Sequence, residues 1–119
     1  MHDPFSSPGL LDLAARDQLA PRLSEGDVWA EVIPTLPPEI RADAEARRRL
    51  GIERYGLPLQ RGNGRDMVLD GYQEALDGIA YAAGIDVGDP ATVDSIRRLT
   101  VRLALLYQQL LQVRSGAVL

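Results

Sequence analysis

Apolar residues recur along most of this chain at intervals of three or four positions, which is the repeat of one face of an α-helix. The repeat is longest over residues 91–114 and is also regular over residues 65–83. No stretch of useful length alternates apolar and polar residues as a half-buried strand does. The sequence therefore predicts an all-α fold, a compact helical bundle of four to five helices.

Each of these two regular helices carries an apolar stripe. In the helix predicted over residues 65–83, the stripe spans an arc of about 100° and is expected to face the core. It consists of Leu69, Tyr72, Leu76, Ile79, Ala80 and Ala83. In the last helix it consists of Val93, Ile96, Leu99, Leu103, Leu106, Tyr107, Leu110 and Val113. This second stripe is long enough to suit self-association, so we expect a homo-oligomer, a dimer or larger.

Prolines and capping residues predict the remaining boundaries. Prolines, whose rings lack the backbone N–H that a helix interior needs, separate three shorter helices expected over residues 10–20, 27–33 and 38–54. Asn63 is expected to cap the helix over residues 65–83, Gly84 to end it, and Asp89 to cap the last helix. Residues 1–9 are predicted to form a flexible N-terminal arm, and residues 10–119 a single helical domain.

Four acidic residues form a stripe on the helix predicted over residues 65–83. They are spaced 4, 4 and 3 positions apart and span about 80° of the helix circumference: Asp66, Asp70, Glu74 and Asp77. Because like charges at this spacing repel, something must compensate them: solvent, arginines of a neighbouring helix, or a divalent cation. Glu74 and Asp77 lie one turn apart and offer the oxygen ligands that Mg²⁺ prefers. Asp66 is best explained as part of the helix cap.

Charge is also segregated along the chain. Residues 41–65 contain seven arginines and three acids, whereas residues 66–94 contain seven acids and no basic residue. This arrangement suits a polyphosphate bound through a metal, with arginines on the phosphate oxygens and carboxylates on the cation. It equally suits two antiparallel helices that pair opposite charges across their seam. Both interpretations remain open from the sequence.

Composition excludes several kinds of chemistry. The chain has no cysteine and a single histidine, His2, which rules out thiolate zinc sites, disulfides and a Ser–His catalytic pair. Its 13 basic residues are all arginine, and its net charge of −4 argues against nucleic acid and anionic membranes as partners. No apolar run approaches the roughly 20 residues that cross a bilayer. The first residues, MHDPFSSPG, lack the features of a signal peptide, so we expect a cytoplasmic protein.

Residues 52–83 resemble small phage and actinobacterial proteins related to the MazG-like nucleotide pyrophosphohydrolases. The resemblance is carried by the pair Tyr55-Gly56, the turn Asn63-Gly64-Arg65-Asp66, the segment from Tyr72 to Asp77, and Tyr81. The ExxD element formed by Glu74 and Asp77 is similar to the second metal-binding motif of that all-α superfamily. The first motif of the superfamily, EExxE, is absent from this chain, and Glu53 is the best substitute for it.

The resemblance implies a Mg²⁺-dependent nucleotide pyrophosphohydrolase. Such an enzyme cleaves an NTP or dNTP between the α- and β-phosphates with a metal-activated water, releasing the monophosphate and pyrophosphate. Glu74 and Asp77 would be the catalytic metal ligands, with Glu53 completing the metal shell. Arg54 and Arg65 are placed to contact the phosphates and Tyr55 to stack on the base. The alternative is a non-catalytic helical protein-interaction module, such as a phage accessory or structural protein.

Overall fold

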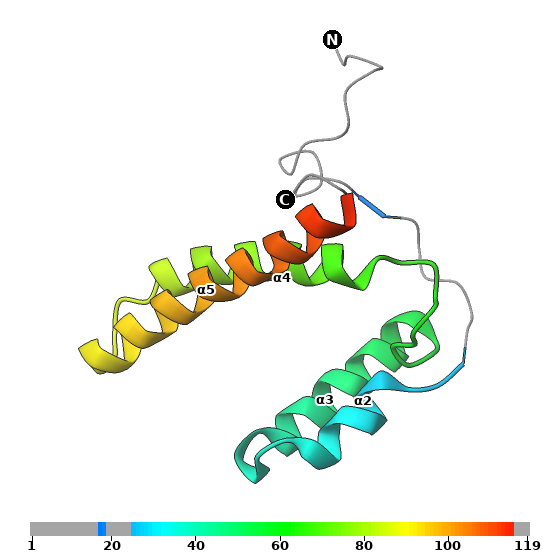
Figure 1. The fold of residues 1–119 in the computed structure, drawn as a ribbon. Coiled ribbons are helices and arrows are strands. Elements are labelled where there is room, and N and C mark those ends of the chain that lie inside the picture. The colour runs from blue at the N-terminus through cyan, green and yellow to red at the C-terminus, as the bar shows by residue number, and fades with distance from the viewer. Residues whose placement is uncertain (1–16, 19–24, 116–119) are drawn as a thin grey trace. The chain divides into compact units, whose positions relative to one another are not determined.

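The computed structural model describes residues 17–18 and 25–115. Its helices, in chain order, are α2 (Val28–Val32), the 3-10 helix η1 (Ile33–Thr35), α3 (Pro38–Tyr55), α4 (Met67–Ala83) and α5 (Pro90–Ser115) (Figure 1). The described residues contain no strand, so the all-α fold class is confirmed. The predicted arm, and the predicted helix over residues 10–20 apart from Asp17 and Gln18, lie outside the described residues. Those two residues are not helical.

The chain divides into two compact units, each described here by itself. One unit, called the α4–α5 unit, contains the chain from Asp66 onward together with Gln18. The other, called the α2–α3 unit, extends to Arg65. The predicted single domain over residues 10–119 stays a prediction. Within the described ranges, no helix combines the length and apolar content that a membrane span requires.

The start of α4 differs from the prediction. Its N-cap is Asp66, whose side chain accepts hydrogen bonds from the backbone N–H groups of Val68 and Leu69, both at 3.1 Å. The predicted cap, Asn63, is therefore wrong. Its Oδ1 instead accepts the backbone N–H of Arg65 at 3.0 Å and forms a turn in front of the helix. An Asx side chain suits either role, so composition alone did not separate the two positions.

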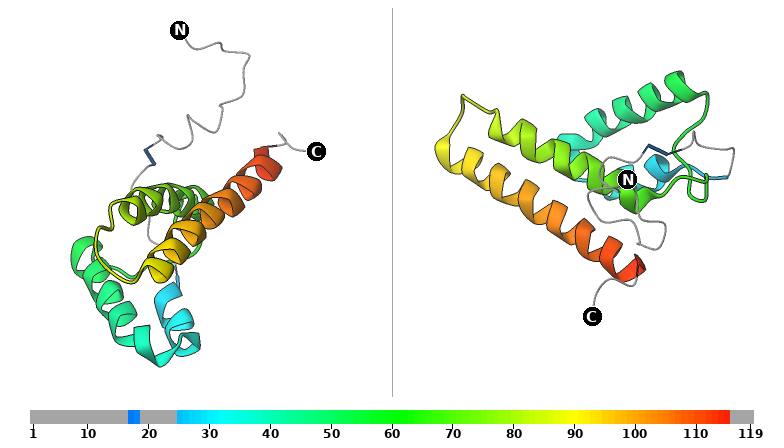
Figure 2. Two further views of the ribbon diagram at one scale, coloured as in Figure 1. Left: turned by 90° about the vertical axis from the view of Figure 1, so that its left-hand side faces the viewer. Right: turned by 90° about the horizontal axis from the view of Figure 1, so that it is seen from above.

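Helices α4 and α5 run antiparallel, side by side, joined by a short loop (Figure 2). Gly84 ends α4 as predicted, and its N–H donates to the carbonyl of Ala80 at 3.1 Å. Asp89 caps α5 as predicted, because its Oδ2 accepts the N–H of Thr92 at 3.0 Å. Arg97 of α5 donates from Nε to the carbonyl of Ala82 at 3.0 Å. The arginine thereby adds a side-chain donor to a carbonyl at the end of α4 that also accepts the backbone N–H of Ile85 at 3.3 Å.

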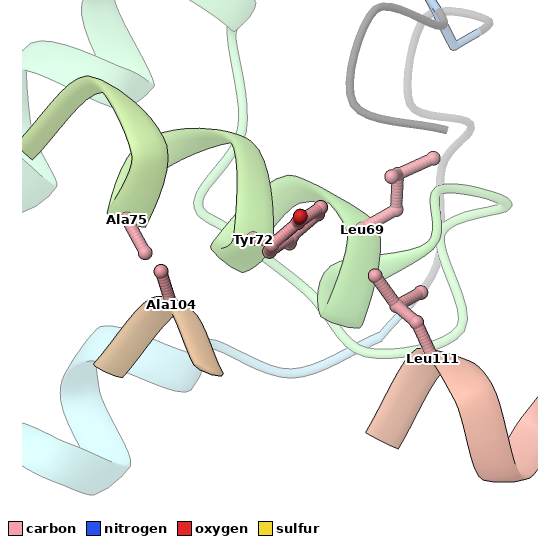
Figure 3. Packing of buried hydrophobic residues seen from close by; sticks show 5 residues of the cluster. All are labelled: Leu69, Tyr72, Ala75, Ala104 and Leu111. Carbon is pink, nitrogen blue, oxygen red and sulfur yellow. The ribbon is translucent and has the colours of Figure 1, made fainter. Parts of the chain in front are cut away.

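The core of the α4–α5 unit lies between these two helices. Its buried members are Leu69, Tyr72, Ala75, Ala104 and Leu111 (Figure 3). Of the predicted α4 stripe, Leu69 and Tyr72 are buried, and Leu76 and Ile79 are half-buried and packed against this cluster. Ala80 and Ala83 were predicted to face the core but are exposed. The buried face is displaced toward Ala75, because its methyl group meets that of Ala104 (Figure 3) and small side chains let two helices approach closely.

Gly71 marks a second close approach between α4 and α5. A Cβ built on this glycine would lie 2.6 Å from Tyr107 Oη and closer still to the ring atoms Cε1 and Cζ. Only a residue without a side chain lets the Tyr107 ring lie against the α4 backbone at this point. The glycine thus serves packing, since it sits in the helix interior, where glycine is otherwise unfavourable.

The α2–α3 unit is held together by polar contacts. Neither α2 nor α3 has a fully buried side chain. Asp27 caps α2, with its Oδ1 accepting the N–H of Ala30 at 3.0 Å, and its Oδ2 receives the Arg48 guanidinium of α3 at 2.8 Å. The hydrogen bond from the Arg48 guanidinium is the main reason why the pKa of the Asp27 carboxyl is lowered. The buried amide of Gln60, in the loop after α3, donates to the carbonyl of Gly26 at 3.1 Å. This hydrogen bond connects that loop to the residues just before α2.

Candidate functional site

The predicted metal ligands Glu74 and Asp77 lie on α4, and both are exposed. They stand one turn apart on the side of the helix away from the buried residues Tyr72 and Ala75. Two exposed carboxylates at this spacing fit the usual contribution of a protein to a magnesium site, where phosphates and water supply the remaining oxygens. Among the described residues, no three acidic or histidine side chains gather at one point. The pair is therefore a partial ligand set.

The first half of the acidic stripe has structural partners. Gln18 Nε2 donates to Asp70 Oδ1 at 2.8 Å and to the Asp66 carbonyl at 3.2 Å. Its Oε1 accepts the Asp66 N–H at 2.5 Å. One glutamine side chain thus binds both polar backbone groups of the residue that caps α4. Asp66 and Asp70 contribute to the start of the helix, which leaves Glu74 and Asp77 as the exposed part of the stripe.

Asp66 also joins the two ends of the hairpin. Arg114, near the end of α5, donates from Nη1 to Asp66 Oδ1 at 2.6 Å, and its Nη2 lies 2.5 Å from Oδ2. Burial raises the pKa of the Asp66 carboxyl, but the hydrogen bonds from Arg114, Leu69 and Val68 outweigh burial, and the pKa is lowered. The negative charge on Asp66 therefore stabilises the folded hairpin.

We expect the Asp66→Asn variant to lose part of the acid sensitivity of this protein. Because the folded-state pKa of Asp66 is lowered, its contribution is present at neutral pH and is lost as the pH falls below about 4, the unfolded value. Asparagine keeps the capping oxygen but not the charge, so the loss at pH 7 should be below about 1 kcal/mol, since Arg114 is 46% exposed. Urea unfolding at a series of pH values measures both effects.

The Asp66→Ala variant separates the cap from the charge. It should lose about 1 kcal/mol more than Asp66→Asn at pH 7, because alanine offers no oxygen to the first N–H groups of α4. Parallel pH profiles for the wild type and Asp66→Asn would contradict the role assigned to the Asp66 charge.

The other predicted site residues belong to the α2–α3 unit. Glu53, Arg54 and Tyr55 occupy the last turn of α3, where all three are exposed. Arg65 is half-buried in the loop that follows, with its backbone N–H bound to Asn63. The predicted phosphate-binding and base-stacking residues and the predicted pair of metal ligands are thus in separate units, and their assembly into one site stays a prediction.

Two arginines of the basic segment have acidic partners within their own unit. Arg48 binds Asp27 and also Glu45, which lies 3.0 Å away, and Arg61 donates to Glu31. In the acidic segment, residues 66–94, Asp66 pairs with Arg114, which lies outside both segments. Except for Glu45, the partners in these pairs lie outside the segment whose charge they balance, so the comparison of the two segments did not include them.

Helix α5 exposes many apolar side chains, six of which belong to the stripe that the sequence predicts. Eight large apolar side chains of α5 are between 39% and 68% exposed. They are Ile96, Leu99, Val101, Leu103, Leu105, Leu106, Leu110 and Val113. Only Ala104 and Leu111 are buried among the described residues of this helix. Six of the eight lie within one arc of about 100° of the helix, whereas Val101 and Leu105 lie on another side. Monomeric proteins rarely expose contiguous apolar patches as large as the one that these six residues form, so the patch indicates an interaction surface.

Comparison with known proteins leaves the resemblance over residues 52–83 a prediction. No family model matches the chain, and neither does any curated protein or solved structure. The functional proposal therefore rests on the geometry and chemistry of the described residues.

Proposed function

We propose that this chain is a non-catalytic helical protein-interaction module in which the α4–α5 hairpin presents the apolar surface of α5 to a partner. The observation that carries the proposal is the exposure of eight large apolar side chains on a helix already packed against α4 through Ala104 and Leu111. Covering such side chains is favourable by roughly 25 cal/mol for each Å² removed from water. A cytoplasmic location, and a partner other than nucleic acid, belong to the same proposal.

If the chain is an interaction module, we expect that Glu74 and Asp77, the exposed acids of α4, do not bind a metal ion. We expect the double variant Glu74→Gln/Asp77→Asn to be as stable as the wild type or more stable by a few tenths of a kcal/mol, because it removes a like-charge repulsion. Magnesium should not raise the melting temperature of either protein. Thermal unfolding with and without Mg²⁺ measures this, with Asp43→Asn, an exposed acid of α3, as the matched control. A magnesium-dependent rise seen in the wild type and Asp43→Asn but lost in the double variant would contradict the proposal.

A Mg²⁺-dependent nucleotide pyrophosphohydrolase is the second candidate function. The observation that favours it is the exposed pair Glu74 and Asp77, one turn apart on α4. A magnesium ion held there would offset the charge of a triphosphate and supply an activated water. Glu53, Arg54, Tyr55 and Arg65 would have to join this pair from the α2–α3 unit.

The two functions are separated by measuring pyrophosphate release from a panel of NTPs and dNTPs, with and without Mg²⁺, beside the Glu74→Gln variant. The interaction module predicts no magnesium-dependent release from any member of the panel by well-folded protein. Release that requires Mg²⁺ and disappears in Glu74→Gln would establish the hydrolase and identify its substrate.

A further inference from the structure

Six of the exposed apolar residues of α5 form a continuous seam along the helix. They follow one another at intervals of 3, 4, 3, 4 and 3 positions: Ile96, Leu99, Leu103, Leu106, Leu110 and Val113. This group is called the outer seam. At 100° per residue it spans an arc of about 100°, and the alternation of three and four is the a/d repeat of helices that pack along their length. Its members are 39–68% exposed.

The contact with α4 uses a different line of residues on α5. Ala104 and Leu111 are buried in the core, Tyr107 packs against it, and Arg97 binds the end of α4. These positions are also spaced by three, four and seven residues, but they lie about 100° around the helix from the outer seam. Helix α5 therefore carries two packing lines side by side, and α4 occupies one of them. The outer seam is shaped for a second helix.

The dimensions of the outer seam indicate what kind of helix fits it. From Ile96 to Val113 the seam is about 26 Å long at 1.5 Å per residue. A matching partner needs a helix of similar length with an uncharged apolar stripe. Helix α2 has only 5 residues, and in α3 nine of 18 residues are charged. Among the described helices, the one with a free stripe of this length and spacing is α5 itself.

Charge and area are consistent with a second copy of the same chain. The outer seam contains no charged residue, and its flanking positions place no acid and two cations beside it, Arg102 and Arg114. The second of these, Arg114, is paired with Asp66 of the same chain. The six side chains expose on the order of 600 Å², at the upper end of the apolar patches found on monomers. A standard protein interface buries about 800 Å² on each partner, so the seam supplies most of what a stable dimer needs.

We propose that two copies of this chain associate through their outer seams to form a two-fold symmetric homodimer, a proposal that rests on the proposed interaction function and specifies its partner. Each α5 then lies between its own α4 and the α5 of the second copy. The same patch serves both partners, as in isologous interfaces.

Sedimentation equilibrium of the full chain at tens of micromolar tests this directly. The wild type should have twice the monomer mass of 13.0 kDa. Leu103→Glu places a charge in the middle of the seam and should raise the dimer dissociation constant by at least about 100-fold. The matched control is Leu105→Glu, because Leu103 and Leu105 are both 47% exposed but Leu105 lies off the seam. The control should remain dimeric.

Two outcomes would overturn the homodimer. One is a wild-type mass of 13.0 kDa at these concentrations, which would leave the surface to a different protein. The other is a helical Leu103→Glu variant that remains as dimeric as Leu105→Glu. If Leu103→Glu loses the circular dichroism signal of a helical protein, Leu99→Glu replaces it, because Leu99 is a seam residue that is 67% exposed. A helical Leu99→Glu variant that remains as dimeric as Leu105→Glu would then overturn the homodimer. The proposed non-catalytic function fails separately, through magnesium-dependent pyrophosphate release.

Discussion

The Leu111→Ala variant should lose about 3 kcal/mol of the free energy of unfolding, the largest effect expected from a single truncation in this protein. Leu111 is 1% exposed and is the largest fully buried apolar side chain among the described residues. Leu69 of α4 lies beside Leu111 in this core (Figure 3), and truncating Leu111 leaves a space that the surrounding side chains fill only partly. The loss therefore combines the transfer of apolar surface with the cost of a cavity.

Urea unfolding followed by circular dichroism measures this loss at one fixed protein concentration, because association of the folded chain would also change the apparent stability. Leu105→Ala is the matched control, since it makes the same truncation on the same helix at a residue that is 47% exposed. The control should lose less than about 1 kcal/mol. Equal losses in the two variants would show that Leu111 does not anchor the contact between α4 and α5.

The Gly71→Ala variant should lose about 2 kcal/mol, even though alanine is normally about 1 kcal/mol better than glycine inside a helix. The added Cβ would collide with the ring of Tyr107, and its distance from the Oη atom would be 2.6 Å. Because the Tyr107 ring is half-buried and packed against the core, α4 and α5 must separate or the ring must leave its position. Thermal and urea unfolding report the loss.

A second glycine of α4 provides the control for Gly71. At Gly78 the nearest atom to an added Cβ is Thr100 Cγ2, at the ordinary contact distance of 3.8 Å. Gly78→Ala should therefore be neutral or gain up to about 1 kcal/mol from helix propensity. Replacing Tyr107 by alanine in the Gly71→Ala background should remove the penalty, which a double-mutant cycle measures as a coupling energy. A stabilised Gly71→Ala variant would contradict the close approach.

The helices themselves could be predicted from local sequence. The ranges expected over residues 27–33, 38–54 and 91–114 match α2, α3 and α5 to within one residue at each end. Prolines, capping aspartates and Gly84 act on the backbone within a few positions of themselves, so their effect does not depend on the rest of the chain. The error at Asn63 arose because two Asx residues three positions apart competed for one cap.

The faces of the helices depended on tertiary contacts. On α4, Ala80 was assigned to the core because it is apolar and in phase, yet it is exposed and Ala75 is buried instead. The sequence pattern predicts which residues share an apolar face of a helix, but the position of the neighbouring helix decides which of them are buried.

Of the eight apolar residues predicted as one stripe on α5, six are exposed and Tyr107 packs against the core. The two residues of α5 that are buried against α4, Ala104 and Leu111, were not in the predicted stripe. The exposed line was readable in the alternation of three and four positions from Ile96 to Val113.

The acidic stripe shows the same limit for the candidate site. Spacing alone placed Asp66, Asp70, Glu74 and Asp77 on one face of α4, and it correctly associated Asp66 with the cap. Asp70 binds Gln18 and Asp66 binds Arg114, whereas Glu74 and Asp77 are exposed. Both partners lie about 50 positions away in the chain from the acids that they bind. Long-range hydrogen bonds of this kind leave no periodic signal.

The sequence by itself determined the fold class, most helix ends and the exclusion of thiol and histidine chemistry, because these follow from residue type and from neighbours within a few positions. Only the tertiary structure decided which apolar residues are buried, why Gly71 must lack a side chain, and which carboxylates remain exposed. Those properties depend on where α5 lies against α4, and a helix packs by the side chains that its neighbour happens to meet.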